Sequence, residues 1–182
     1  MKVKKDSTDR QVTTTKLKVV GILVLPLFYL GAYLTISATN IYRETIIHWT
    51  IPLLIWLTSG FCILPFTYSF LKESGEKSYT LWQLLYNCIT FGGIIYYLVM
   101  TLNFSFPYSS ISRQKIKIIE KGHLSSFRSC GNPYARVIIN DNNKELIFDC
   151  GTNIDKSTNV ELTIKNGLLG FDIISNKILT DE

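Results

Sequence analysis

Charged residues are missing from three long stretches of this 182-residue chain. Asp, Glu, Lys and Arg are absent from residues 19–42, 45–71 and 78–112. A helix needs about 20 apolar residues to cross a hydrocarbon core of about 30 Å, and helices of soluble proteins rarely run that far without a polar face. The sequence therefore predicts three transmembrane helices, over residues 19–41, 46–70 and 79–102. The absence of Asp, Glu, Lys and Arg inside them argues against a proton-driven transporter.

Histidine is also scarce, which bears on catalysis. His48 and His123 are the only two in the chain, and neither has Cys, Asp or Glu at the spacing of metal ligands. Gly167-Leu168-Leu169-Gly170 has no helix after it and does not resemble a phosphate-binding loop. We therefore expect no metal, no cofactor and no enzymatic activity.

The four cysteines fall into two pairs. Cys62 and Cys88 lie within predicted helices and are expected to be packing residues. Cys130 and Cys150 lie in the C-terminal part, each followed by glycine. A disulfide between them would stabilise a small domain by roughly 3 kcal/mol and would indicate an oxidising compartment. Two buried thiols are the alternative.

Basic residues concentrate at the N-terminus. The tail over residues 1–18 holds six Lys and Arg residues against two Asp residues. Because cytoplasmic flanks of membrane helices carry excess Lys and Arg, this tail is expected to face the cytoplasm of a bacterial inner membrane. The C-terminal domain would then be periplasmic or extracellular, although Arg113, Lys115 and Lys117 after the third helix oppose that orientation. A tail beside a membrane segment favours anchoring over nucleic-acid binding.

The pattern changes after the helices. Residues 107–182 alternate polar and apolar side chains in short runs, which is typical of strands. Turns are expected at Lys121-Gly122 and around Asn142, and Asn166-Gly167 is a strong two-residue hairpin signal. The predicted fold is a membrane α region over residues 19–106 followed by a small all-β domain, a six-stranded antiparallel meander or small barrel.

One surface of the β domain has the chemistry of an anion site. Arginine and an aromatic ring on one face can stack on a ligand and neutralise a phosphate. The candidate ligand-binding residues are Lys121, Arg128, Tyr134 and Arg136. A solvated strand face is the alternative.

Two functions follow from this layout. The first is a non-enzymatic accessory or structural subunit of a bacterial envelope complex. Its partners are the lipid bilayer and other membrane or envelope proteins, with self-association of the helices, and exposed strand edges recruit a partner segment. The second is a ligand-gated membrane effector whose β domain binds a nucleotide-like anion in the cytoplasm.

Overall fold

The computed structural model describes residues 4–71, 79–108, 111–124 and 131–181. The chain forms two compact units, and their boundaries cut through the helices. Residues 1–36 and 55–96 make the first unit, and residues 37–54 and 97–182 make the second. The second unit thus combines the ends of three helices with the β strands. The predicted boundaries, a tail over 1–18, a membrane region over 19–106 and a β domain over 107–182, stay predictions.

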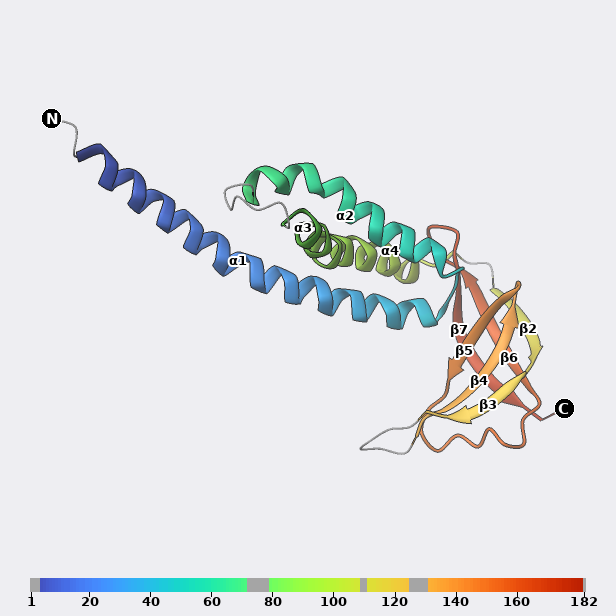
Figure 1. The fold of residues 1–182 in the computed structure, drawn as a ribbon. Helices are drawn as coiled ribbons and strands as arrows, with labels where there is room; N and C mark the ends of the chain where they lie inside the picture. Colours follow the sequence, from blue (N-terminus) through green and yellow to red (C-terminus); the bar gives the residue numbers. More distant parts are fainter. Residues whose placement is uncertain (1–3, 72–78, 109–110, 125–130, 182) are drawn as a thin grey trace. The chain divides into compact units, whose positions relative to one another are not determined.

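Long apolar helices dominate the first half of the chain (Figure 1). The segments are α1 (Lys4–Arg43), α2 (Thr50–Leu71), α3 (Tyr79–Asn87), a π-helical turn (Cys88–Gly92) and α4 (Gly93–Ser105). Three stretches, Val24–Arg43, Thr50–Thr67 and Leu81–Ser105, are long and apolar enough to cross a membrane. The prediction of three such helices is confirmed.

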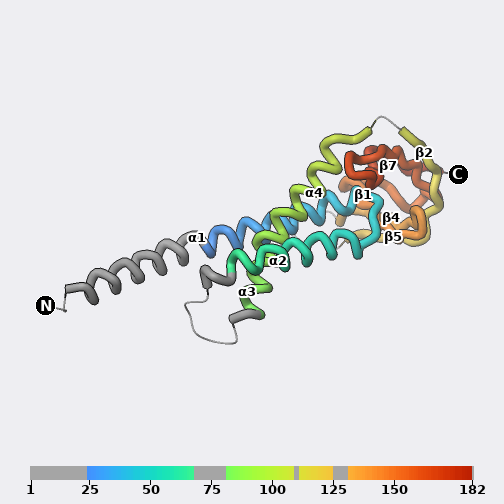
Figure 2. Tube along the Cα trace, turned by 90° about the horizontal axis from the view of Figure 1, so that it is seen from above, coloured from blue at the N-terminus to red at the C-terminus, as the bar shows by residue number. Residues whose placement is uncertain are grey.

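Glycines allow the helices of the first unit to approach closely (Figure 2). A Cβ atom added at Gly31 of α1 would lie 2.5 Å from the Cα of Thr90 in the π turn. Gly93, just after this turn, faces Gly31, whereas Gly92 faces the backbone of Trp56 in α2. Small residues at helix interfaces permit such backbone contact. The π turn, a widened helical turn, thus presents adjacent glycines to two different helices.

Polar side chains also join helices in this unit. Thr67 of α2 accepts hydrogen bonds from the Asn87 amide at 2.7 Å and from the Gln83 amide at 3.3 Å. The Tyr86 hydroxyl donates to the Val24 carbonyl of α1 at 3.1 Å. Interhelical hydrogen bonds in apolar surroundings contribute about 0.6–2 kcal/mol each. Close packing and these bonds together hold the first unit.

We expect Gly31→Ala to destabilise the protein by about 2 kcal/mol, because the added methyl group overlaps the backbone at Thr90. The measurement is the thermal unfolding midpoint of the purified chain in detergent. Leu30→Ala, which changes an exposed neighbour on the same helix, is the control. Equal midpoints for Gly31→Ala and wild type would contradict the close approach of these helices.

The described residues of the second unit form seven strands in two antiparallel sheets. One sheet has the order β1-β7-β6-β2 and the other β3-β4-β5. The strands are β1 (Thr45–Ile46), β2 (Ile111–Lys117), β3 (Glu120–His123), β4 (Pro133–Ile139), β5 (Asn142–Ile147), β6 (Asn159–Asn166) and β7 (Asp172–Thr180).

The chain passes from one sheet to the other between β2 and β3. The Ile118 N–H donates to Thr158 beside the first sheet at 3.0 Å, and the Ile119 N–H donates to Arg136 of the second at 2.9 Å. The sheets therefore join at this bend, and the first curves as half a barrel. Their inner faces enclose one core, whose fully buried members include Ala135, Val137, Ile139, Ile154, Val160 and Leu162.

The predicted count of six strands is wrong, because the described residues form seven, among them β1 and β3, which the sequence did not predict. Thr45 and Ile46 pair with Ile173 and Asp172 of β7, so the second helix begins at Thr50 and not at residue 46. Thr45 and Ile46 lie within an uncharged run of the sequence, so they were assigned to the helical region and the pairing was not predicted.

The predicted turn at Lys121-Gly122 is also wrong, as is the placement of His123 in it. All three residues belong to β3, where Gly122 pairs with Tyr134. A Cβ at Gly122 would lie 2.6 Å from the Tyr134 ring, so the glycine makes room for this aromatic side chain and does not mark a turn. The strand predicted from Leu124 to Cys130 falls mostly on residues 125–130, outside the described residues.

The two hairpin predictions have different outcomes. The β4–β5 turn lies at Asn140-Asp141, where positive φ values of 49° and 62° fit a two-residue turn, so the predicted turn is shifted by about one residue. The expected two-residue hairpin at Asn166-Gly167 is wrong, because residues 167–171 separate β6 from β7.

Asn103 of α4 explains the longer loop. Its amide donates to the Phe171 carbonyl at 3.0 Å and accepts from the Leu169 N–H at 3.0 Å. A Cβ at Gly167 would overlap the same amide. The loop thus wraps around a fully buried side chain from the end of α4.

Replacing Asn103 with alanine should lower the free energy of unfolding by about 2–4 kcal/mol, since buried loop groups lose their partners. Chemical denaturation in detergent, followed by the β signal in circular dichroism, measures this loss. The matched control is Asn159→Ala, because the Asn159 amide bonds only to neighbouring Thr158 at the surface. A loss no greater than that of the control would show that Asn103 does not hold the loop.

Candidate functional site

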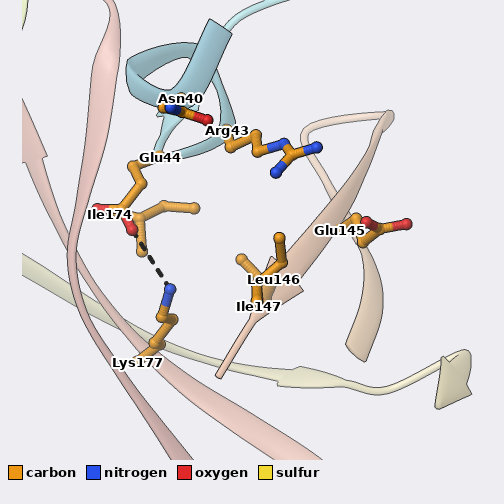
Figure 3. A pocket seen from close by; sticks show the side chains of 8 residues that line it. All are labelled: Asn40, Arg43, Glu44, Glu145, Leu146, Ile147, Ile174 and Lys177. Carbon is orange, nitrogen blue, oxygen red and sulfur yellow. Dashed lines mark hydrogen bonds and ion pairs between the residues drawn. The ribbon is translucent and has the colours of Figure 1, made fainter. Parts of the chain in front are cut away.

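The two sheets leave an open side between β5 and β7. β5 is the last strand of its sheet, and β7 is flanked by β1 only at Asp172 and Ile173. A cavity of about 200 Å³ lies there (Figure 3). It is lined by the end of α1, by β5 and by β7, through Asn40, Arg43, Glu44, Glu145, Leu146, Ile147, Ile174 and Lys177.

The C-terminal end of α1 enters this open side and is bonded to both strands. The last carbonyls of a helix have no partner within the helix. Here the Lys144 ammonium donates to the Tyr42 carbonyl at 3.2 Å, and the Ile174 N–H donates to the Glu44 carbonyl at 2.8 Å. Lys177 of β7 also forms an ion pair with Glu44 at 3.3 Å. The helix end therefore links β5 to β7, which no strand of the described residues joins.

Lys144 is a buried cation. It lies in β5 on the same face as Leu146, which points into the core, and its exposed fraction is 4%. Its ammonium lies 3.8 Å from the centre of the Tyr42 ring, and no carboxylate of the described residues forms an ion pair with it. The ring and the carbonyl favour the charged form, but desolvation outweighs them and lowers the pKa of Lys144 to about 8.

The free edge of β5 carries backbone groups available for pairing. In an antiparallel ladder, alternate residues direct their N–H and C=O toward the neighbouring strand. The Phe148 N–H donates to Pro133 of β4, so Ile147, Glu145 and Asn143, one, three and five residues before it, direct theirs outward. Exposed strand edges with such unpaired groups accept a further strand.

The four predicted ligand-binding residues are only partly brought together. Tyr134 and Arg136 lie on the outer face of β4, where Arg136 forms ion pairs with Glu120 and, at 3.6 Å, with Glu145. The Tyr134 hydroxyl donates to Glu120 as well. The positive charge of Arg136 is therefore compensated by two carboxylates, a poor setting for an anion.

Lys121 does not join this pair. Lys121 of β3 donates to the Asp155 carbonyl at 2.9 Å. It pairs with Ala135, which lies between Tyr134 and Arg136 in β4, so it is out of register with both of these residues. Arg128 lies outside the described residues. The anion site therefore stays a prediction.

The three cysteines in the described residues differ in their bonding. Cys62 and Cys88 carry free thiols, and Cys150 is disulfide-bonded. Cys130 lies outside the described residues, so its pairing with Cys150 remains a prediction.

The residues around the cavity were missed by the sequence reasoning. The sequence analysis assigned Asn40, Arg43, Glu44 and Lys177 to no site. Lys144 could have been found from the sequence. Side chains alternate between the two faces of a strand, so Lys144 shares a face with the apolar residues Leu146 and Phe148 and points inward. A lysine on the buried face of a strand needs a partner for its ammonium group, and so indicates a candidate site.

No protein family, curated protein or solved structure matches this chain. Within the described residues, no group of three or more His, Cys, Asp and Glu side chains is placed to hold a metal ion. The candidate site is therefore the open side between β5 and β7, where the cavity lies.

We predict that the stability difference between wild type and Lys144→Met depends on pH. The pKa of Lys144 lies at about 8 in the folded chain against an ordinary value of 10.5, so the unfolded chain binds more protons between these values. Wild type should therefore gain up to about 3 kcal/mol relative to the variant as the pH rises from 8 to 10.5. Unfolding midpoints of both proteins across this range provide the measurement, and a difference that is independent of pH would contradict the burial of this charge.

Proposed function

We propose that this chain is a non-enzymatic integral membrane protein, an accessory subunit of a bacterial envelope complex. Its β domain binds an extended segment of a partner protein along the free edge of β5. The observation that carries the proposal is the open side of the sheets, where β5 has no further strand beside it among the described residues and β7 is flanked by β1 only at Asp172 and Ile173. Adding a strand to an exposed edge is a common mode of peptide recognition.

Two features support a binding role for this edge. The end of α1 already bonds to β5 and β7 from one side, so the edge is held in a fixed place and little ordering is required on binding. Natural sheets usually cover or blunt their edges. At the start of β5, Asn143 is exposed and Asn142 is half-buried, whereas Lys144 points inward and so does not guard the edge.

The proposed location is the bacterial inner membrane, with the N-terminal tail in the cytoplasm and the β domain outside. The basic tail and the disulfide-bonded Cys150 support this orientation, because disulfides persist in oxidising compartments. An outward β domain would meet envelope partners. The cytoplasmic, anion-gated alternative is less favoured, since Arg136 is already compensated by carboxylates.

A photo-crosslinking amino acid placed at Asn143 in living cells tests this function. We expect one discrete adduct from Asn143, on the free edge, and none from Ile138, which is 53% exposed but lies on the central strand β4. Glu145→Pro removes an outward N–H and should abolish the adduct, whereas Glu145→Ala keeps that N–H and should retain it.

Circular dichroism of purified Glu145→Pro checks that the domain still folds, as expected for proline at an outward position of an edge strand. Adducts of equal yield from Asn143 and Ile138, or an adduct that survives Glu145→Pro in a folded domain, would contradict strand addition at β5.

A further inference from the structure

The cavity at the end of α1 holds opposite charges in equal number. Arg43 and Lys177 are the cations, and Glu44 and Glu145 are the anions. In Figure 3, Asn40 and Arg43 enter from the helix, Glu44 and Lys177 lie at one side, and Glu145 lies at the other. Such a lining suits a ligand that itself carries one charge of each sign.

Several of these groups keep bonding capacity. No hydrogen bond or ion pair joins the Arg43 guanidinium or the Asn40 amide to another described residue. Glu145 reaches Arg136 only at 3.6 Å, with about a third of its side chain exposed, and such a pair is worth about 0–1 kcal/mol. The cavity therefore offers donors from α1 and an accepting carboxylate from β5.

The size of the cavity limits the ligand. Pockets for drug-sized molecules enclose roughly 300–1,000 Å³, whereas this one encloses about 200 Å³. Leu146, Ile147 and Ile174 give it an apolar part beside the charges. A small polar group of a few heavy atoms that is covalently attached to an apolar chain fits this lining.

The position along α1 indicates the source of that group. Arg43 is the last residue of the apolar stretch Val24–Arg43, so in a membrane-spanning α1 it lies at the depth of the lipid headgroups. The neighbouring Trp49 is 60% exposed, and exposed tryptophan is typical of that layer.

We propose that this cavity binds the headgroup of a zwitterionic phospholipid that carries a phosphate and a primary ammonium. Arg43 and Asn40 donate to the phosphate, since a guanidinium matches phosphate oxygens in a bidentate fork. Glu145 accepts hydrogen bonds from the ammonium. A choline headgroup has no N–H to donate and is disfavoured at the carboxylate. One lipid would thus fill the space between the helix end and β5.

Native mass spectrometry of the full chain tests this, after reconstitution in nanodiscs of equimolar phosphatidylethanolamine and phosphatidylcholine and release into detergent. Wild type should retain phosphatidylethanolamine several-fold over phosphatidylcholine. Glu145→Gln should remove the preference between these lipids, and Arg43→Gln should lower retention of both about tenfold. Arg113→Gln, at an exposed site on β2, is the matched control and should behave as wild type.

Three outcomes would overturn the proposal. The first is an unchanged lipid preference in Glu145→Gln together with unchanged lipid retention in Arg43→Gln, with folding of both variants verified by circular dichroism. The second is stronger retention of phosphatidylglycerol, which has no ammonium, in a parallel reconstitution. The third is displacement of the retained lipid by equimolar free phosphoethanolamine, which would assign the cavity to a soluble ligand.

Discussion

The free carbonyls at the C-terminal end of α1 set the constraint on which the second unit depends. A helix end cannot remain unsatisfied beside a protein core, and here two strands satisfy it, β5 through Lys144 and β7 through the Ile174 N–H. These bonds lie on the open side of the sheets, beside the edge of β5 to which no further strand of the described residues pairs. The same bonds bury the Lys144 ammonium against Tyr42, and this burial lowers its pKa to about 8. The open side, the cavity and the buried lysine therefore share one cause.

A second tie comes from α4, where Asn103 holds the loop between β6 and β7. Together with β1, these contacts make the ends of the helices part of the β unit itself, as the division of the chain at residues 36/37 and 96/97 reflects. Within this unit, a segment bound at β5 would act on residues that are hydrogen-bonded to the end of α1. This coupling favours a role in assembly, where a bound partner is held at a defined position.

The sequence predicted those features that depend on local composition. Uncharged runs located three apolar helices, and alternation located most strands of the β domain. The errors arose where a distant residue decides local structure. In the sequence Gly122 resembles a turn residue, but in the structure it makes room for Tyr134. Asn166-Gly167 resembles a tight hairpin, but the loop is longer because it wraps around the side chain of Asn103. Most of the cavity residues were unpredictable for the same reason, since residues 40–44 and 145–177 meet only through the tertiary fold.

The central claim is that the end of α1 is fixed between β5 and β7. Spin labels at Asn40 and Asn143, both exposed, report on it most directly, after replacement of the free cysteines Cys62 and Cys88. Pulsed electron–electron double resonance of the full chain in nanodiscs should give a single narrow distribution of the distance between the two labels. This distribution should broaden when Lys144→Met and Lys177→Met are combined. A broad distribution in the chain with both lysines intact would show that the helix end is not held there, and would contradict the account.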